Sequence, residues 1–137
     1  MKKNFRKKIV LVSMSADVIH HGHINIINEA RKYGDVTIAL VADEIVAKHK
    51  RLPYLNWEQR KKIIENIKGV VKVFKQTEWD YSPSIMSLKP DYLVHGTDWK
   101  KGSLKRLRDS AIKSLKSYGG KLIEVSYTKG ISAMNLS

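Results

Sequence analysis

Two histidines, His20 and His23, lie three residues apart in the stretch Asp17-Val18-Ile19-His20-His21-Gly22-His23. The stretch follows an apolar run at residues 9–12 and precedes a helical pattern, so the sequence predicts a strand-to-helix turn. Side chains three apart in a first helical turn share a face, and Gly22 lets a ligand approach the backbone. Free N–H groups at a helix start attract anions. The residues therefore predict a phosphate-binding turn.

A zinc site and a purely structural role are the alternative interpretations of this histidine pair. Zinc needs three or four protein ligands, and no cysteine or carboxylate extends the pair at helical spacing. The chain contains no cysteine at all, which excludes disulfides, thiolate metal sites and a cysteine nucleophile. We expect His21 to be structural because it faces away from the other two on the turn.

The elements that must position this turn alternate along the chain. Buried strands are predicted at residues 8–13, 36–41, 70–74, 92–94 and 122–125. Helices are predicted at residues 22–33, 57–68 and 103–118, with a short helix feeding a basic loop over 42–54 and another from Ser82 to just before Pro90. In helix 57–68 we expect Asn56 as the cap and Ile63, Ile64 and Ile67 as the apolar stripe.

This alternation predicts a doubly wound, Rossmann-like α/β fold with a parallel sheet of about five strands and helices on both faces. Residues 1–7 form a basic tail, and residues 8–137 form a single domain. Ligands of such sheets bind beyond the carboxyl ends of the strands. The histidine turn, the loop at 95–99 and the turn at 130–132 all follow strands, so we expect them to converge on one edge of the sheet.

The chain is strongly basic, with 26 Lys and Arg against 13 Asp and Glu and a formal net charge of +13. Such a field favours anionic partners, either nucleic acid or a phosphorylated small molecule. A basic nucleic-acid-binding module remains the alternative from another class, but no nucleic-acid motif is recognisable, so nucleic acid is not expected. The apolar runs are too short to span a bilayer and no cleavable signal is recognisable, so we expect a cytoplasmic protein without a membrane partner.

The histidine stretch, together with Gly130-Ile131-Ser132, resembles the paired signatures of the cytidylyltransferase family, a branch of the HxGH nucleotidyltransferases. The resemblance runs from about residue 8 to residue 136. Trp57-Glu58-Gln59-Arg60 resembles the family's arginine-bearing helix, and His95-Gly96-Thr97-Asp98-Trp99 resembles its Gly-Asp-Asp-Trp loop. The resemblance implies CTP as the nucleotide, Mg²⁺ as the cofactor and a homodimer.

Three further stretches resemble the phosphonate branch of that family, which is often fused to phosphoenolpyruvate mutase. They are Met14-Ser15-Ala16-Asp17, Lys50-Arg51-Leu52-Pro53-Tyr54 and Tyr127-Thr128-Lys129-Gly130-Ile131-Ser132. Glycerol-3-phosphate enzymes usually carry Gly-Thr-Phe-Asp in place of the first and Arg-Thr-Glu at the start of the last. The resemblance thus implies transfer of CMP from CTP to a small phosphonate, with 2-aminoethylphosphonate favoured. Phosphocholine, phosphoethanolamine and glycerol 3-phosphate remain alternative acceptors.

The chemistry of this reaction needs no protein nucleophile. A phosphonate or phosphomonoester already carries negative oxygens, so its own oxygen attacks the α-phosphorus in line and pyrophosphate leaves. Catalysis is then mainly positioning and charge neutralisation. We expect His20 and His23 to donate to the triphosphate and Lys50 to bridge nucleotide and acceptor anions.

The resemblance extends to a set of ligand-binding residues. The expected catalytic residues are His20, His23 and Lys50, and the expected nucleotide-binding residues are Ser13, Met14, Ser15, Asp17, Gly22, Lys48, Arg60, Gly96, Asp98, Trp99, Thr128, Gly130, Ile131 and Ser132. Without the resemblance, Arg60 and Lys48 would be interpreted as solvated charges and Trp99 as part of the core. Trp79, Asp80, Tyr81 and Tyr127 could enclose an ammonium group, and we assign Tyr81 and Tyr127 to the acceptor. No side chain is predicted to ligate the metal.

Overall fold

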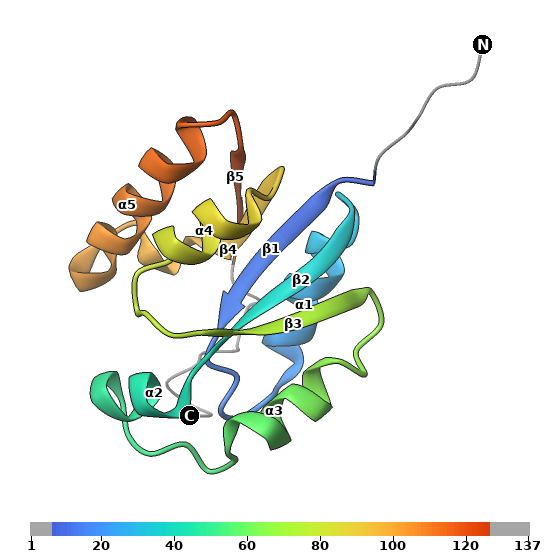
Figure 1. Ribbon diagram of the computed structural model, residues 1–137, viewed down its shortest axis with the longest axis vertical. Helices are drawn as coiled ribbons and strands as arrows, with labels where there is room; N and C mark the ends of the chain where they lie inside the picture. The colour runs from blue at the N-terminus through green and yellow to red at the C-terminus, as the bar shows by residue number, and fades with distance from the viewer. Residues whose placement is uncertain (1–6, 127–137) are drawn as a thin grey trace.

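The computed structural model describes residues 7–126, which form a five-stranded parallel sheet with the order β3-β2-β1-β4-β5 (Figure 1). The strands are β1 (Ile9–Met14), β2 (Asp35–Val41), β3 (Val70–Gln76), β4 (Tyr92–Gly96) and β5 (Lys121–Val125). The helices are α1 (His21–Ala30), α2 (Asp43–His49), α3 (Trp57–Ile64), α4 (Ser82–Leu88) and α5 (Lys105–Lys116), and short 3₁₀ turns span Thr97–Trp99 and Gly102–Leu104. The predicted doubly wound α/β fold is confirmed.

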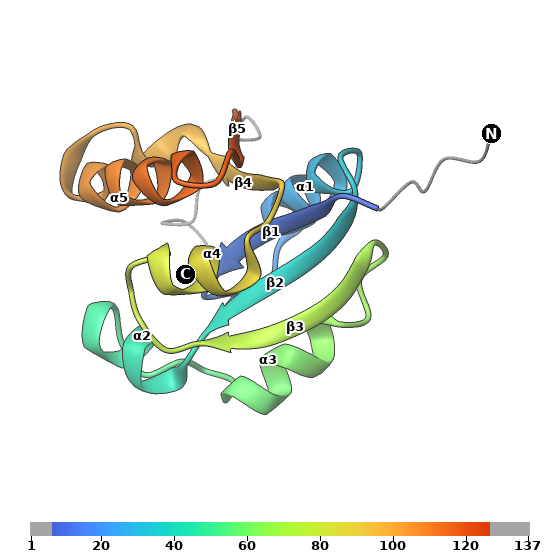
Figure 2. The same cartoon turned by 45° about the horizontal axis from the view of Figure 1, so that its top comes forward.

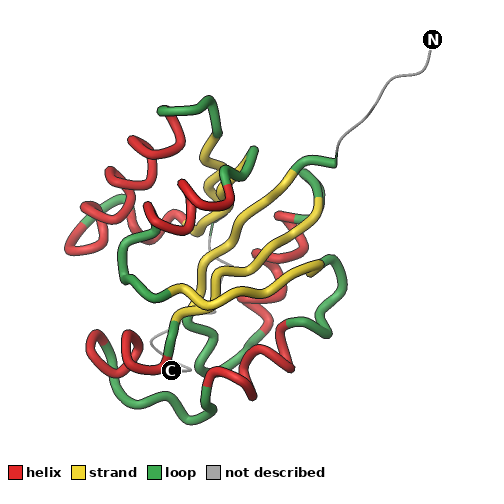
Figure 3. The backbone as a smooth tube through the Cα atoms, viewed as in Figure 1, coloured by secondary structure: helices red, strands yellow, loops and turns green. Residues whose placement is uncertain are grey.

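The central strand β1 is buried on both faces, as its continuous apolar run predicts. Val10 and Val12 pack in one core cluster with residues of α1 and α3, whereas Leu11 packs in a second cluster with residues of α4 and α5. Because successive strand side chains point to opposite faces, this alternation places one pair of helices on each face of the sheet, as Figure 3 shows. None of the helices within residues 7–126 is long and apolar enough to cross a membrane.

The strand order reverses between β1 and β4. The chain moves outward from β1 to β2 and then β3, and afterwards returns to pair β4 with the other side of β1. In open α/β sheets a crevice forms outside the carboxyl ends of the strands at such a point. Figure 2 shows that α2 lies beyond the carboxyl ends of β1 and β2, next to this position.

Helix α3 differs from its prediction in length and in its buried face. It ends at Ile64, and its buried residues are Trp57, Arg60 and Ile64. These three positions share a face at helical spacing, which leaves Ile63 on the flank with 43% of its surface exposed. The prediction of Ile63 as an inward residue was therefore wrong. The predicted capping box at Asn56 and Gln59 is confirmed, because each side chain accepts from the other's backbone N–H at 2.9 Å.

Candidate active site

A cavity of about 270 Å³ lies at the carboxyl ends of β1 and β4, where the strand order reverses. The end of β1 and the histidine turn form one wall, and the loop after β4 forms the opposite one. Its lining residues are Val12, Ser13, Met14, Ser15, His20, Gly22, His23, Ile26, Lys50, Trp79, Tyr81, Val94, His95, Gly96, Asp98, Trp99, Leu104 and Leu107. The predicted convergence of the histidine turn with loop 95–99 is confirmed.

The two histidines form the cap of α1. The Nδ1 atom of His20 accepts from the Gly22 N–H at 3.0 Å, and the Nδ1 atom of His23 accepts from the His20 N–H at 3.3 Å. A nitrogen that accepts a hydrogen bond carries no hydrogen, so each neutral ring must carry its hydrogen on Nε2. The capping hydrogen bonds of this turn thus fix the same tautomer, with hydrogen on Nε2, in both rings. Both rings lie at one rim of the cavity.

Both rings are neutral at pH 7. Burial lowers the pKa of His23 to about 4, and the charges of His20 and Lys50 act in the same direction. Burial also lowers the pKa of His20, with a smaller contribution from His21. His20 and His23 therefore act as hydrogen-bond donors through Nε2–H rather than as fixed positive charges.

Lys50 supplies the positive charge of this cluster. It follows the last residue of α2 and leaves the helical conformation, with φ −132° and ψ −85°. Its side chain lines the cavity, as predicted. Lys48 is exposed on the last turn of α2 and does not line the cavity. The structure thus brings Lys50 to the cavity but not Lys48, and the contact of Lys48 with the nucleotide stays a prediction.

Asp17 is buried beside the cavity but does not line it. Its carboxylate accepts a hydrogen bond from the Arg51 guanidinium and another from the Tyr54 backbone N–H at 2.7 Å. The turn bends sharply just before it, because Ala16 adopts a left-handed conformation with φ 52°. Asp17 therefore joins the histidine turn to the loop after Lys50, and the structure does not place this predicted nucleotide ligand among the cavity-lining residues.

Arg60 is a second predicted nucleotide ligand that does not line the cavity. Only 1% of its surface is exposed. Its guanidinium donates to the Ser15 carbonyl, to the Leu55 carbonyl at 3.2 Å and to the Asp43 carboxylate at 2.6 Å. These partners belong to the turn after β1, the loop before α3 and the first turn of α2. Arg60 ties together the segments that carry Ser15 and Lys50, and its burial among these partners indicates a structural role.

The opposite wall is aromatic. The ring of His95 stacks on Trp99 with centroids 3.6 Å apart and an interplanar angle of 9°. The Trp99 indole N–H donates to Glu124 at 2.8 Å, and Arg108 donates to the same carboxylate through two nitrogens. The hydrogen bond from Arg108 holds the pKa of Glu124 at about 2, so the carboxylate is ionised at neutral pH. Three residues that we expect to bind the nucleotide, Gly96, Asp98 and Trp99, line this wall, and Trp99 is fully buried in it.

Sequence reasoning missed His95 and Glu124. The His95 Nδ1 lies 2.8 Å from the Gly96 carbonyl oxygen and must donate to it, so its Nε2 accepts from the Tyr81 hydroxyl at 3.1 Å. Burial lowers the pKa of His95, which keeps the ring neutral. Its position directly after the predicted strand 92–94 could have identified it, although the structure extends that strand, β4, to Gly96. Glu124 gives no such signal, since its partners are distant in sequence.

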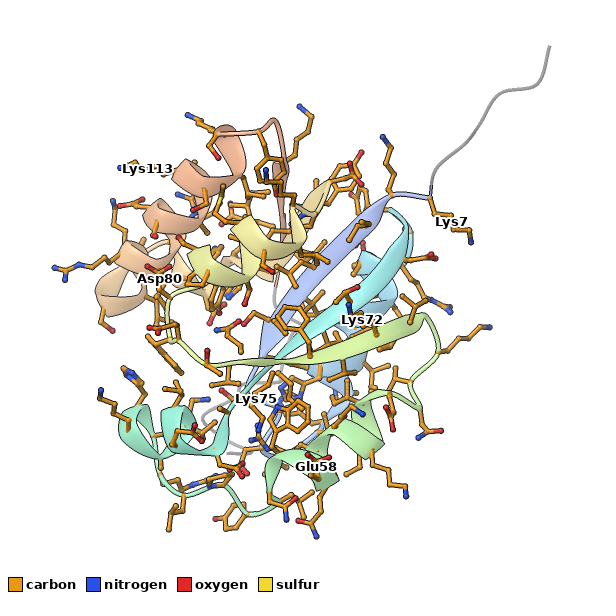
Figure 4. The ribbon with its side chains drawn as sticks, in the orientation of Figure 1. Lys7, Glu58, Lys72, Lys75, Asp80 and Lys113 are labelled. Atoms are coloured by element: carbon orange, nitrogen blue, oxygen red, sulfur yellow. The ribbon has the colours of Figure 1, made fainter. Side chains whose placement is uncertain are left out.

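Of the residues expected around the acceptor's ammonium group, only some line the cavity. Trp79 and Tyr81 line the cavity. Asp80 between them does not: its carboxylate accepts from the Ser82 backbone N–H at 2.9 Å and from the Ser110 hydroxyl at 3.1 Å, beside α4 and α5 in Figure 4. Asp80 therefore anchors the loop that carries the two rings. The other predicted site residues, Tyr127, Thr128, Gly130, Ile131 and Ser132, lie outside the described residues.

The described residues do not fit a magnesium site built by the protein alone. Within residues 7–126, no group of three or more His, Asp or Glu side chains could hold a metal ion. Asp98 is the one acidic side chain among the described residues that line the cavity. The cavity instead offers neutral donors and an ammonium group at one rim and stacked rings at the other, which suits an anion joined to an aromatic base.

Known proteins resemble this chain over most of its length. Residues 15–133 match the family described as cytidylyltransferase-like. FAD synthase of Archaeoglobus fulgidus is 42% identical over 96 residues, which cover 66% of this chain and 70% of that protein. FAD synthase of Archaeoglobus profundus is 39% identical over 89 residues, which cover 65% of this chain and only 57% of that protein.

A solved structure confirms the fold. The lipopolysaccharide core biosynthesis protein from Thermoplasma volcanium superposes with a TM-score of 0.73 at 20% identity, covering 92% of this chain and 100% of that one. At this identity the likeness concerns the fold alone. The family match, by contrast, includes the histidine turn and the loop after β4, the two walls of the cavity. This chain belongs to the cytidylyltransferase-like family of nucleotidyltransferases.

Proposed function

We propose that this chain transfers CMP from CTP to a small phosphonate, with 2-aminoethylphosphonate as the favoured acceptor, and releases pyrophosphate. The observation that carries nucleotidyl transfer is the joint presence of His20, His23 and Lys50 at one rim of a cavity whose other rim is aromatic. The nucleoside would lie along the wall formed by the end of β4 and the loop after it, and the triphosphate would meet the histidine turn.

In the proposed reaction an acceptor oxygen attacks the α-phosphorus, and a new P–O bond forms as the bond to pyrophosphate breaks. The attacking oxygen is already ionised, so no proton has to be removed. Negative charge develops on the leaving pyrophosphate, where the Nε2–H groups of His20 and His23 donate and the Lys50 ammonium adds a positive charge. Ser13 is not the nucleophile in this scheme, because its hydroxyl donates to Gln76 at 2.7 Å. A magnesium ion would accompany the triphosphate as its counter-ion.

The choice of a phosphonate acceptor is supported by sequence stretches that the fold brings together. Met14-Ser15-Ala16-Asp17 and Lys50-Arg51-Leu52-Pro53-Tyr54 resemble the phosphonate branch. Asp17 accepts from both Arg51 and the Tyr54 N–H, so the two stretches act as one unit. Trp79 and Tyr81 also line the cavity, and aromatic faces attract an ammonium group such as that of 2-aminoethylphosphonate.

Transfer of AMP is the second candidate, because a FAD synthase is 42% identical to this chain. FAD consists of AMP joined to FMN, so the corresponding reaction would use ATP and FMN. This acceptor also attacks through a phosphate oxygen, and the same three donors would stabilise the leaving pyrophosphate.

Pyrophosphate release with CTP or ATP, measured against each acceptor in turn, separates these candidates. The acceptors are 2-aminoethylphosphonate, phosphocholine, phosphoethanolamine, glycerol 3-phosphate and FMN. We expect release only with CTP and 2-aminoethylphosphonate. Release with ATP and FMN would establish the second candidate and overturn the first, and a lack of release with every pair would overturn both.

A further inference from the structure

The two residues that flank Lys50 are each attached to a different side of the cavity. Arg51 donates to the buried carboxylate of Asp17 in the turn after β1. His49 stacks on Trp79 in the loop after β3, with ring centroids 4.2 Å apart and an interplanar angle of 12°. Residues 49–51 therefore bridge two strand ends, and the cavity-lining Lys50 is the central residue of that bridge.

Helix geometry alone does not fix the direction of the Lys50 side chain. The Lys50 N–H still bonds to the Val46 carbonyl at 2.7 Å, but the Lys50 backbone has already left the helical conformation. The loop after Lys50 is held by contacts to Asp17 instead. Because Asp17 is only 7% exposed, its carboxylate requires hydrogen-bonding partners, and the structure gives it Arg51 and the Tyr54 N–H.

Arg51 is itself held in place on its other side. Its guanidinium lies over the Tyr54 ring, with the central carbon 4.2 Å from the ring centroid. It does not line the cavity, whereas Lys50 does and lies close enough to His23 for its charge to lower the pKa of that ring. Lys50 thus lies at the cavity between neighbours that stay outside the cavity or at its edge.

We propose that Asp17 and Arg51 are positioning residues that hold the Lys50 ammonium against the histidine turn, with the His49–Trp79 stack as a second anchor. This inference rests on the proposed function, because Lys50 is the group that meets the triphosphate. Arg51 acts through Lys50 and makes no contact of its own with the bound anion.

A double-mutant cycle tests this dependence. Inorganic tripolyphosphate serves as the probe, and its dissociation constant is measured by calorimetry for the wild type, Arg51→Ala, Lys50→Ala and the double variant. We expect Arg51→Ala to weaken binding about tenfold in the wild type and less than about twofold when Lys50 is already absent. Equal losses in both backgrounds would mean that Arg51 contacts the anion directly or acts only on global stability, and would overturn the inference.

Matched variants separate positioning from loss of charge or of folding. Lys113→Ala removes one exposed positive charge on α5, labelled in Figure 4, that does not line the cavity, and it should leave tripolyphosphate binding unchanged. Arg51→Lys keeps a charge beside Asp17 and should restore part of the lost affinity. If Arg51→Ala fails to fold, His49→Ala provides the same cycle, because it removes an anchor without leaving a buried carboxylate unpaired.

The cycle also distinguishes failure of the inference from failure of the proposed function. Tripolyphosphate binding by the wild type without pyrophosphate release from any nucleotide would contradict the proposed function, while the cycle would still decide the role of Arg51. A wild type that does not bind tripolyphosphate would overturn the positioning role, since Lys50 would then not lie in an anion site. In the active enzyme, Arg51→Ala should raise the KM for the nucleotide about tenfold, in parallel with the weaker tripolyphosphate binding, and should also lower kcat, because the same ammonium meets the leaving pyrophosphate.

Discussion

The His23 ring accepts a hydrogen bond from the backbone N–H of His20 at 3.3 Å, and the two imidazole centroids lie 4.3 Å apart. This contact and the bond from the Gly22 N–H to His20 use both Nδ1 atoms. The same contacts that begin α1 therefore leave both Nε2 atoms as hydrogen-bond donors. Helix capping and the proposed stabilisation of pyrophosphate depend on opposite ends of the same two rings.

Substitution of His20 can separate these two roles. Asparagine is a good helix cap, so His20→Asn should keep the bond from the Gly22 N–H and change the free energy of unfolding by less than about 1 kcal/mol. It removes the Nε2–H donor, and we expect kcat to fall about 10²- to 10³-fold. Urea unfolding and pyrophosphate release measure the two effects. His20→Ala is the comparison, since it should lose both the cap and the activity.

The low pKa of His23 makes stability depend on pH. The pKa is about 4 in the folded chain against an ordinary value of 6.5, so the unfolded chain takes up more protons between these values. Stability contributed by the neutral ring is present above pH 6.5 and is lost as the pH falls toward about 4. The loss should approach about 3 kcal/mol at the lower end, measured by urea unfolding. His23→Asn keeps an acceptor for the His20 N–H and should flatten this part of the profile; an unchanged slope would contradict the assignment.

The low pKa of Glu124 should make the free energy of unfolding depend on pH in a second, lower range. Its folded pKa is about 2 against an ordinary 4.5, so its contribution is present above pH 4.5 and lost as the pH falls toward 2. Glu124→Gln removes the charge that Arg108 contacts and should lower the free energy of unfolding by about 1–3 kcal/mol at neutral pH. The difference from the wild type should shrink on acidification. A difference that stays constant from pH 7 to pH 2 would show that the charge of Glu124 does not matter.

The buried Arg60 should be required for folding rather than for binding. Arg60→Met leaves the Ser15 carbonyl and the Asp43 carboxylate without their partner and should cost about 3 kcal/mol. We expect the folded fraction of this variant to retain measurable affinity for tripolyphosphate. Calorimetry at low temperature checks this, with Arg106→Met, an exposed position on α5, as the control for loss of an arginine. A normally stable Arg60→Met protein that no longer binds tripolyphosphate would instead identify Arg60 as a ligand.

The sequence was sufficient to predict the sheet and the convergence of the two walls of the cavity, for a physical reason. The histidine turn and loop 95–99 follow apolar runs, and parallel strands place all such loops at one edge, so their convergence results from the alternation of elements. Arg60 could not be assigned in the same way, because an arginine on a lysine-rich helix is usually solvated. Its partners Ser15 and Asp43 belong to other elements and meet it only in the folded chain. The same holds for Asp17, whose partner Arg51 lies 34 residues further along the chain.

The measurement that tests the central claim most directly is the formation of the CMP–acceptor product from CTP and 2-aminoethylphosphonate, followed by ³¹P NMR in the wild type and in His20→Asn. The proposed function and the geometry of the histidine turn together predict equal amounts of product and pyrophosphate from the wild type. They predict almost none from a His20→Asn protein of the same stability. Wild-type rates of product formation in His20→Asn would contradict the role of the His20 Nε2–H group, and the absence of a CMP–acceptor product from the wild type would contradict the proposed function.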